Sequence, residues 1–586
     1  MIQEKSLHYY LTKAKDEKIN SFQKQVKIGF LSSFTINGLA ETLQAKCAEN
    51  NVRCEYYVGS YDQYSQEILS KNSELYKFCP DIVFLLLDNR SLFGDLYHDI
   101  SSLNTEQRKL LISTKLQEIK NLISFFSSNT NSKLIISNLT IPIFSSFGIN
   151  ETKQDYGFRE MILTLNSELI STFRDQNNIF VYDFNIFSSK HGHKNIFDLK
   201  NFLFGDIQIN LDYIPYLAHE LQSYVNAFLG LTKKCIVLDL DNTLWGGVIG
   251  EDGIENIKLG PQAPGNAFYE FQKTLKALKQ RGIILAINSK NNFDDAMKVI
   301  REHPYMILKE DDFSCMKINW NDKVKNLEEI SNELNIGLDS IVFFDDDKVN
   351  CEFISLSLPQ VKVINLTEDP SYFTEILQEM NDFDSLKITI EDLKRTQMYS
   401  EQIKRDSLKN ASVSIDDFLK NLDMNITIKK SNNFTIPRIS QLTLKTNQFN
   451  LTTKRYQEEE IRNLTLDDNF FVGCAQVQDK FGDNGITGIF IIDKHNSDEW
   501  FVDSFLLSCR IMGRNVEKAI MAYIIEEAKK NNVKKIIGKY IPTPKNKPIE
   551  NFLSDCGFLE FNDKWVYDPC NALKLPEFLT VKVENE

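Results

Sequence analysis

The chain has 586 residues, of which 42% are hydrophobic and 25% are charged, and this length predicts three or four domains with large buried cores. A net charge of −14 disfavours a general nucleic-acid binder and a protein that binds anionic membranes. The ten cysteines form no Cys-x-x-Cys pair, so we expect reduced thiols and neither a zinc site nor a disulfide framework. No signal-like apolar stretch follows Met1, and the cytoplasm is the expected location.

Residues 1–230 alternate apolar runs with helical stretches, a rhythm typical of an α/β layer fold. The predicted strands are Val26–Leu31, Ile82–Leu87, Leu134–Ser137 and Ile179–Tyr182. His191 and His193 flank a glycine, and a solvated turn is the preferred interpretation of that pair over a metal site.

Residues 231–380 repeat this rhythm more tightly and form the second predicted domain. We predict its strands at Cys235–Leu240, Ile283–Asn288 and Ile341–Phe344, with helices at Asn266–Gln280 and Asp322–Leu334. The first apolar run is short and uninterrupted, as in a buried parallel strand. Residues 245–265, between the first strand and its helix, leave room only for a small cap.

Polar side chains with phosphoryl-transfer chemistry follow the strands of this second domain. They are Asp239, Asp241 and Thr243 after the first strand, Ser289 after the second, Lys323 at a helix start, and Asp345 and Asp346 after the third strand. Open α/β sheets bind ligands at the carboxyl ends of their strands. Phosphoryl transfer needs a nucleophile, fixed donors for the phosphoryl oxygens, and a divalent cation held by hard oxygen ligands.

Residues 381–586 form the third predicted domain, a mixed α+β segment preceded by a linking helix over 385–408. The predicted strands are Phe470–Gln478, Ile486–Ile492 and Trp500–Ser508, and a helix follows over Val516–Lys530. Lys445–Thr453 mixes cationic, amide and hydroxyl side chains and is predicted to line a polar site. Arg510–Asn515 directly precedes a helix N-terminus, where backbone N–H groups bind phosphate well.

The order Asp-x-Asp-x-Thr, Ser, Lys, Asp-Asp at successive strand ends resembles the haloacid dehalogenase (HAD) superfamily. This resemblance implies that Asp239 is the nucleophile, and that Asp241 is the acid/base and gives its backbone carbonyl to Mg²⁺. It implies that Thr243 and Ser289 orient the site and bond the phosphoryl group, and that Lys323 steadies the charge. The implied metal site consists of Asp239, Asp241, Asp345 and Asp346.

Longer strings resemble the FkbH-like family over essentially the whole chain. They are Trp245–Gly253, Ser289–Asn292, Ile318–Lys323 and Lys445–Thr453. The resemblance implies an enzyme that dephosphorylates 1,3-bisphosphoglycerate and loads a glyceryl unit onto an acyl carrier protein.

Two positions depart from that family. Asn288 stands where relatives often carry a Cys that holds the glyceryl group as a thioester, and Asp347-Lys348 replaces an Asn-Pro pair. An amide provides no nucleophilic thiolate, so the covalent acyl-carrying step is open, with Cys315 and Cys351 as other nearby thiols.

The flanking segments resemble two further families. The first resembles a degenerate SGNH hydrolase, with Ser33 at the nucleophile position but without the family's catalytic His, so docking or scaffolding is the expected role. The last resembles an N-acetyltransferase (GNAT), which implies that Arg510, Gly513, Arg514 and Asn515 bind coenzyme A or a phosphopantetheine moiety, although Asn515 replaces a small residue.

We therefore expect an α/β protein with a central HAD-type Rossmann-like parallel sheet and a small cap, flanked by an SGNH-like α/β domain and a GNAT-like α+β domain. The expected activity is that of a Mg²⁺-dependent phosphatase that acts on a phosphorylated three-carbon acid and passes the acyl unit to a carrier protein. Two alternatives stay open. One is a phosphatase or phosphotransferase in surface-polysaccharide or secondary-metabolite biosynthesis without acyl transfer, and the other is a non-catalytic scaffold that binds a carrier protein.

Overall fold

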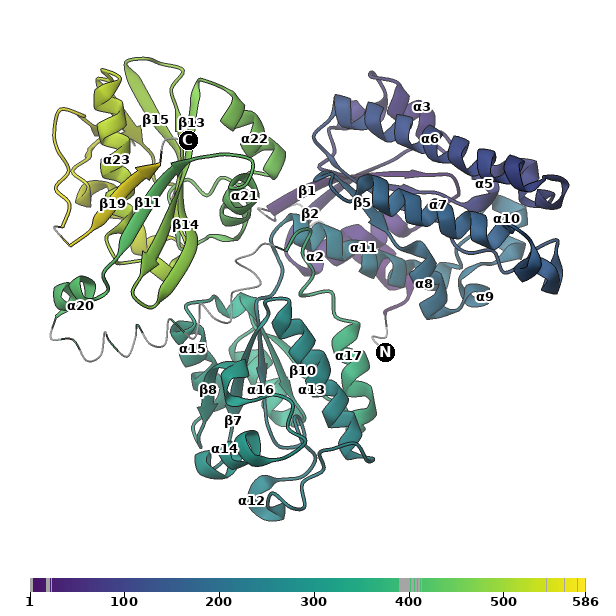
Figure 1. The fold of residues 1–586 in the computed structure, drawn as a ribbon, viewed down its shortest axis with the longest axis horizontal. Helices are drawn as coiled ribbons and strands as arrows, with labels where there is room; N and C mark the ends of the chain where they lie inside the picture. Colours follow the sequence, from purple (N-terminus) through teal and green to yellow (C-terminus); the bar gives the residue numbers. More distant parts are fainter. Residues whose placement is uncertain are drawn as a thin grey trace. The chain divides into compact units, whose positions relative to one another are not determined.

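The computed structural model describes residues 4–16, 22, 24–388, 401, 405, 408, 412, 414–543, 545–562, 564–576 and 578–584. The chain divides into two compact units, Gln3–Val225 and Asn226–Glu586 (Figure 1). Among the described residues, the first unit contains one β-sheet and the second contains two. No helix in the described part of the chain is both long and apolar enough to cross a membrane. Most of the linking helix expected over 385–408 lies outside the described residues.

The sheet of the first unit has five parallel strands in the order β2-β1-β3-β4-β5. Its strands are β1 (Lys24–Ser32), β2 (Val52–Val58), β3 (Ile82–Leu86), β4 (Lys133–Ser137) and β5 (Ile179–Tyr182). The larger helices are α2 (Leu39–Glu49), α6 (Thr105–Asn129), α7 (Phe158–Phe173) and α11 (Ile214–Phe228). Shorter helices are α1 (Leu7–Lys13), α3 (Tyr64–Leu69), α4 (Glu74–Phe78), α5 (Asn89–Phe93), α8 (Phe184–His191), α9 (His193–Ile196) and α10 (Leu199–Gly205).

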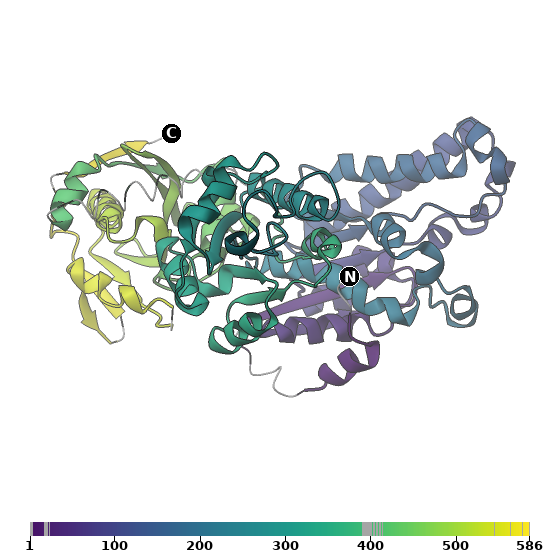
Figure 2. The ribbon, with the colours of Figure 1, turned by 90° about the horizontal axis from the view of Figure 1, so that it is seen from below.

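Helices cover both faces of this sheet. Successive side chains of a strand point to opposite faces, so each central strand packs against helices on both sides. Val83 and Leu85 of β3 pack in one apolar cluster with α6 and α7, which lie side by side (Figures 1 and 2). Phe84, between them, meets Tyr224 of α11 on the other face. The predicted α/β layer architecture of this segment is confirmed.

The second sheet also has five parallel strands, in the order β10-β9-β6-β7-β8. Its strands are β6 (Cys235–Leu238), β7 (Ile284–Ser289), β8 (Phe313–Ile318), β9 (Ile341–Asp345) and β10 (Lys362–Asn365). Its helices are α12 (Ile249–Asp252), α13 (Gly265–Gln280), α14 (Phe293–Glu302), α15 (Lys323–Glu333), α16 (Lys348–Ser357) and α17 (Phe373–Gln378).

The middle of this sheet is a two-sided core. Ile236 and Leu238 of β6 pack in a cluster that includes α13, whereas Cys235 and Val237 pack in the cluster that includes α15. All four side chains are fully buried, as expected for a strand with helices on both faces. The segment between β6 and α13 contains the single short helix α12 and a bridge between Gly246 and Lys258, which agrees with the predicted small cap.

A buried carboxylate fastens α13 to the segment before β8. Asp312 accepts hydrogen bonds from Lys276 Nζ at 2.6 Å, Lys279 Nζ at 2.5 Å and the backbone N–H of Lys309 at 2.8 Å. Burial alone would raise the pKa of Asp312, but the two ammonium groups hold it below its ordinary value. This contact therefore stabilises the fold in its ionised form.

The third sheet is mainly antiparallel and has the order β17-β18-β16-β15-β14-β13-β11-β19, with β12 paired to β15. Its longer strands are β11 (Asn425–Lys430), β13 (Phe470–Asp479), β14 (Gly482–Asp493), β15 (Glu499–Leu507) and β19 (Thr580–Glu584). Its shorter strands are β12 (Phe449–Asn450), β16 (Lys535–Gly538), β17 (Leu559–Phe561) and β18 (Lys564–Tyr567). Its helices are α20 (Ile415–Asn421), α21 (Ile436–Lys445), α22 (Glu458–Leu466), α23 (Val516–Lys530) and α24 (Phe552–Asp555).

Helix α23 forms much of the core beneath this third sheet. Its residues Val516, Ile520 and Ile524 are fully buried in one cluster with strands β13 to β16. The helix has the bounds predicted from the sequence. An α+β segment, as expected, therefore follows the second sheet.

Candidate active site

The predicted catalytic residues meet at the carboxyl edge of the second sheet. Asp239 directly follows β6, Ser289 ends β7, and Asp345 ends β9. These three strands are neighbours and run parallel, so their carboxyl ends lie at one edge. Lys323 begins α15, after the loop that leaves β8 at the same edge.

Three carboxylates at this edge form a group that can hold a metal ion. One oxygen from each of Asp239, Asp345 and Asp346 lies within 4.8 Å of the others, and this is the one such group of acidic, His or Cys side chains among the described residues. Burial raises the pKa of Asp345 and of Asp346, and the neighbouring charge of Asp239 raises both further. Crowded, poorly hydrated carboxylates favour a divalent cation with a preference for oxygen ligands, and Mg²⁺ fits this donor set.

Lys323 supplies the fixed positive charge of the site. Its Nζ lies 2.6 Å from Asp345 Oδ2 and 3.0 Å from Asp239 Oδ2, and its side chain is almost fully buried. Burial alone would lower the pKa of Lys323, but the two carboxylates raise it above its ordinary value. Lys323 is therefore a charged donor that can steady both the nucleophile and a phosphoryl oxygen.

The carboxylate of Asp241 accepts hydrogen bonds from three donors. Among the described residues, it is not part of the metal-binding group formed by Asp239, Asp345 and Asp346. Its Oδ1 accepts from Trp245 Nε1 at 2.8 Å and from the backbone N–H of Ile249 at 3.1 Å, while Oδ2 accepts from Asn291 Nδ2 at 2.9 Å. Burial raises its pKa, although these hydrogen bonds oppose the shift. This geometry is compatible with an acid/base whose orientation is fixed.

Trp245 and Asn291 hold the carboxylate of Asp241 by hydrogen bonds, and the sequence interpretation assigned neither residue a role. Both lie in strings that carry the family resemblance, and Trp245 is fully buried with its indole N–H on Asp241. One sequence signal could have identified Trp245. It stands four residues after Asp241, and the short turn between the two residues can bring its indole N–H to that carboxylate.

Thr243 and Ser289 are the least exposed of the predicted catalytic residues. The hydroxyl of Thr243 is fully buried and has no hydrogen-bond partner among the described residues. Ser289 is buried, and its carbonyl accepts the backbone N–H of Asn319 at 3.1 Å. This bond ties the end of β7 to the loop that leads to Lys323.

Asn288 has a structural role at the position where relatives carry Cys. Its Nδ2 donates to the carbonyl of Lys323 at 2.9 Å, and its Oδ1 accepts from Asn326 Nδ2 at 3.0 Å. Asn288 and Asn326 are fully buried, and Asn326 also donates to Asn319. The amide therefore positions the first turn of α15 and, with it, the lysine of the site.

The two thiols considered as substitutes are buried. Cys315 donates to Glu333 at 3.1 Å, and burial, together with that carboxylate, raises its pKa well above the ordinary value. Cys351 lies on α16, with its thiol directed at the carbonyl of Asp345. A nucleophilic thiolate at Cys315 is disfavoured by this environment.

The four residues predicted to bind a cofactor lie between β15 and α23, and their side chains have different surroundings. Gly513 and Asn515 both have positive φ, of 73° and 61°, and α23 begins directly after them. Arg514 turns inward, where its guanidinium lies 3.4 Å from the buried Asp479 and donates to the carbonyl of Arg510 at 2.8 Å. Arg510 lines a pocket in the described part of the chain.

The predicted remnant of a hydrolase site in the first unit is closed. Ser33 donates to Asp88 Oδ2 at 2.7 Å, but its side chain is buried. His191 ends α8 and packs against Phe187 and Tyr216, and His193 begins α9, so these histidines belong to two short helices and not to the solvated turn that was predicted.

The fold and the site together define a phosphatase of the HAD class. An aspartate pair, a lysine and a second acidic pair stand at the ligand-binding edge of a parallel sheet with a small cap. The N-terminal part of the protein BF1531 from Bacteroides fragilis, a structure containing a phosphatase domain complexed with Mg, is 30% identical to this chain. The match covers 65% of this chain and 100% of that one, with a TM-score of 0.60.

The chain belongs to the FkbH-like family. A family model of the FkbH N-terminal domain matches residues 27–226. A GNAT-family acetyltransferase from Staphylococcus aureus is 14% identical over 25% of this chain and 99% of that chain, with a TM-score of 0.21. No curated protein matches the chain.

Proposed function

We propose that this protein is a Mg²⁺-dependent phosphatase that acts on 1,3-bisphosphoglycerate and delivers a glyceryl unit to an acyl carrier protein. The observation that carries the proposal is the group formed by Asp239, Asp345 and Asp346, with Lys323 between Asp239 and Asp345. Family membership supports the substrate and the carrier protein.

The donor set suits a hard divalent cation. Asp239, Asp345 and Asp346 would hold it through carboxylate oxygens, and the backbone carbonyl of Asp241 is the proposed fourth ligand. When bound, the ion neutralises negative charge on the phosphoryl oxygens. The Mg found with the phosphatase domain of the Bacteroides fragilis protein supports this assignment.

The proposed reaction uses the chain's own carboxylates in two stages. An oxygen of Asp239 bonds to the phosphorus of the phosphate ester at the third carbon as the bond from that phosphorus to the ester oxygen breaks, and Asp241 gives that oxygen a proton. Water then attacks the aspartyl phosphate, Asp241 takes back a proton, and phosphate leaves with Asp239 restored. Lys323 stabilises the charge throughout, because its two ion pairs hold it at the site.

The acyl group would pass directly to the carrier protein. The carrier's thiolate attacks the carbonyl carbon of the acyl phosphate at the first carbon, which the Asp239 step leaves intact, and inorganic phosphate is the leaving group. Asn288 has no thiol, and burial raises the pKa of the Cys315 thiol well above its ordinary value, which supports a direct transfer. A phosphopantetheine arm or coenzyme A moiety is the proposed ligand of the loop that contains Arg510.

Asn288 also favours a second candidate function, a phosphatase or phosphotransferase without acyl transfer. The two functions share the Asp239 site and differ in the fate of the acyl group. The complete set of phosphatase side chains disfavours the third possibility, a non-catalytic scaffold.

The decisive experiment incubates the full chain with 1,3-bisphosphoglycerate, Mg²⁺ and candidate carrier proteins, followed by phosphate assay and intact mass of the carrier. Phosphate release together with a glyceryl adduct on the carrier supports the proposal. Phosphate release without any carrier adduct would leave the phosphatase function alone. Absence of turnover on every phosphorylated three-carbon acid tested would refute the substrate class.

A further inference from the structure

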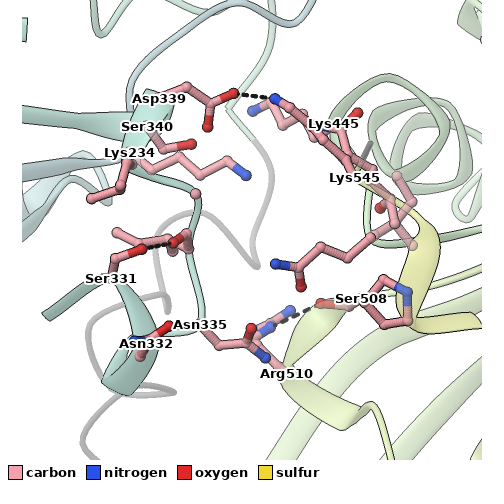
Figure 3. Close-up of a pocket in the computed structure, with 18 of the residues that line it drawn as sticks. Lys234, Ser331, Asn332, Asn335, Asp339, Ser340, Lys445, Ser508, Arg510 and Lys545 are labelled. Atoms are coloured by element: carbon pink, nitrogen blue, oxygen red, sulfur yellow. Dashed lines mark hydrogen bonds and ion pairs between the residues drawn. The ribbon is translucent and has the colours of Figure 1, made fainter. Parts of the chain in front are cut away.

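A second polar pocket lies within the Asn226–Glu586 unit, away from the catalytic carboxylates. Its volume is about 560 Å³, and Figure 3 shows side chains entering it from two directions. Lys234, Asn335 and Ser340 come from the phosphatase sheet and its helices, whereas Lys445, Ser508 and Arg510 come from the third sheet and its helices (Figure 3).

The pocket is at the opposite edge of the phosphatase sheet from Asp239. Lys234 precedes β6 and Ser340 precedes β9, so both stand at the amino ends of the strands whose carboxyl ends carry Asp239 and Asp345. A strand rises roughly 3.3 Å per residue, which separates the two edges by more than 10 Å. A ligand here is therefore distinct from the phosphoryl group at the catalytic site.

The pocket is strongly cationic in an acidic protein. Among the described residues that line it, the cations are Lys234, Arg438, Lys445, Arg510 and Lys545, and the one acid is Asp339. Asp339 is paired with Lys545. The whole chain carries a net charge of −14, so this concentration of positive charge is local. Ammonium and guanidinium groups are the side chains that bind phosphate oxygens in proteins.

The polar groups that accompany these cations are held in place. Arg438, Gln441 and Lys445 follow one another at helical spacing on α21, and Arg438 donates to Gln441. The next loop is fixed by Arg455, whose guanidinium donates to the carbonyl of Thr446 at 2.9 Å and to Asn447 Oδ1 at 2.5 Å. A rigid binding surface loses less entropy when a ligand binds.

We propose that this pocket is a binding site for a small molecule that bears a phosphate ester or pyrophosphate group. Lys445 and Arg510 from one side, and Lys234 from the other, supply the charge that such a group requires. Amide and hydroxyl side chains, including Asn335, Ser340 and Gln441, supply hydrogen bonds for the rest of the molecule. The ligand contacts both sheets of the unit at once, and its binding stabilises them together.

The test measures anion binding to the full chain by calorimetry and by thermal shift in the presence of EDTA, with inorganic pyrophosphate and coenzyme A as separate probes. Without a metal, the carboxylates around Asp239 repel anions, so the catalytic site does not compete. We expect pyrophosphate to bind and to raise the melting temperature. Tighter binding of coenzyme A than of pyrophosphate would assign the site to an organic phosphate, and the reverse would assign it to a compact phosphate compound.

Charge-reversed variants locate the binding. Lys445→Glu and Arg510→Glu should each weaken pyrophosphate binding at least ten-fold, and the milder Lys445→Gln should weaken it by less, which guards against a folding defect. Lys530→Glu is the matched control, because Lys530 is an exposed lysine on α23 whose ion-pair partner is Glu527. Asp239→Asn should bind like the wild type. The proposal is overturned if neither probe binds, if both reversals leave binding unchanged, or if Asp239→Asn abolishes it.

Discussion

Replacing Lys323 with Met removes the ammonium group that lies between Asp239 and Asp345. Lys323 is 4% exposed, Asp345 is 0% exposed and Asp239 is 8% exposed, so water screens these charges weakly. Methionine fills a similar volume but donates no hydrogen bond. Removing one partner of a buried ion pair lowers the free energy of unfolding by about 3–5 kcal/mol, because the other charge stays buried without compensation.

This loss should depend on the metal. In EDTA we expect the second sheet of Lys323→Met to be destabilised by about 4 kcal/mol. Mg²⁺ brings positive charge to the same carboxylates, so it should stabilise the variant more than it stabilises the wild type. Phosphatase turnover should still fall by roughly 100-fold or more, since a fixed charge that stabilises the transition state contributes on that order.

Amide hydrogen exchange of peptides from β6 and β9, measured in EDTA and in Mg²⁺, reports the local stability of the second sheet. This measurement does not assume that a large chain unfolds in one step. Lys298→Met is the control, because Lys298 is exposed on α14. A loss below about 1 kcal/mol in EDTA, set against the expected 3–5 kcal/mol, would refute the energetic reasoning. A variant that keeps more than a tenth of wild-type turnover would refute the catalytic role.

Four further outcomes are expected. Asp239→Asn should abolish phosphate release with little change in thermal stability, and Asp346→Ala should raise the Mg²⁺ concentration for half-maximal activity; metal-independent activity in either assay would contradict the site. Asn288→Leu should lower the free energy of unfolding by about 2 kcal/mol, since two buried amide hydrogen bonds are lost, and unchanged hydrogen exchange in α15 would count against this. Asp312→Asn should cost about 2 kcal/mol at neutral pH. Because the folded pKa of Asp312 is depressed, its contribution to stability is present above the unfolded pKa of about 3.9 and is lost as the pH falls through the folded pKa. The difference in stability between Asp312→Asn and the wild type should therefore vanish in acid. A difference that stays constant across pH would contradict this, and so would an equal effect of Asp311→Asn at the exposed neighbouring residue.

The strand ends of the phosphatase sheet could be predicted because their pattern is local. The central strands β6, β7 and β9 are short uninterrupted apolar runs with both faces buried, and this gives a clear signal in the sequence. The edge strands β8 and β10 were not predicted. They lie at the two ends of the sheet, where one side is open and polar residues such as Lys317 and Lys362 are tolerated.

The supporting contacts of the site could not be predicted, because their partners are far apart in the chain. Asn288 is 38 residues from Asn326, and Asn291 is 50 residues from Asp241. An amide side chain bonds whichever donor or acceptor the packing brings to it, so its residue type specifies no partner. The burial of Ser33 and the pairing of Arg514 with Asp479 have the same cause.

The sequence by itself predicted which residues carry the chemistry, since Asp239, Asp241, Lys323, Asp345 and Asp346 each follow a recognisable local pattern. Only the tertiary structure decided how these groups act on one another. Parallel strands bring their carboxyl ends to one edge, where burial and close approach of like charges create the need for a cation. The same folding places Lys234 and Lys445 around one cationic pocket, although they are more than 200 residues apart in the chain. The distance between two side chains in space depends on how the elements pack and not on their separation along the chain.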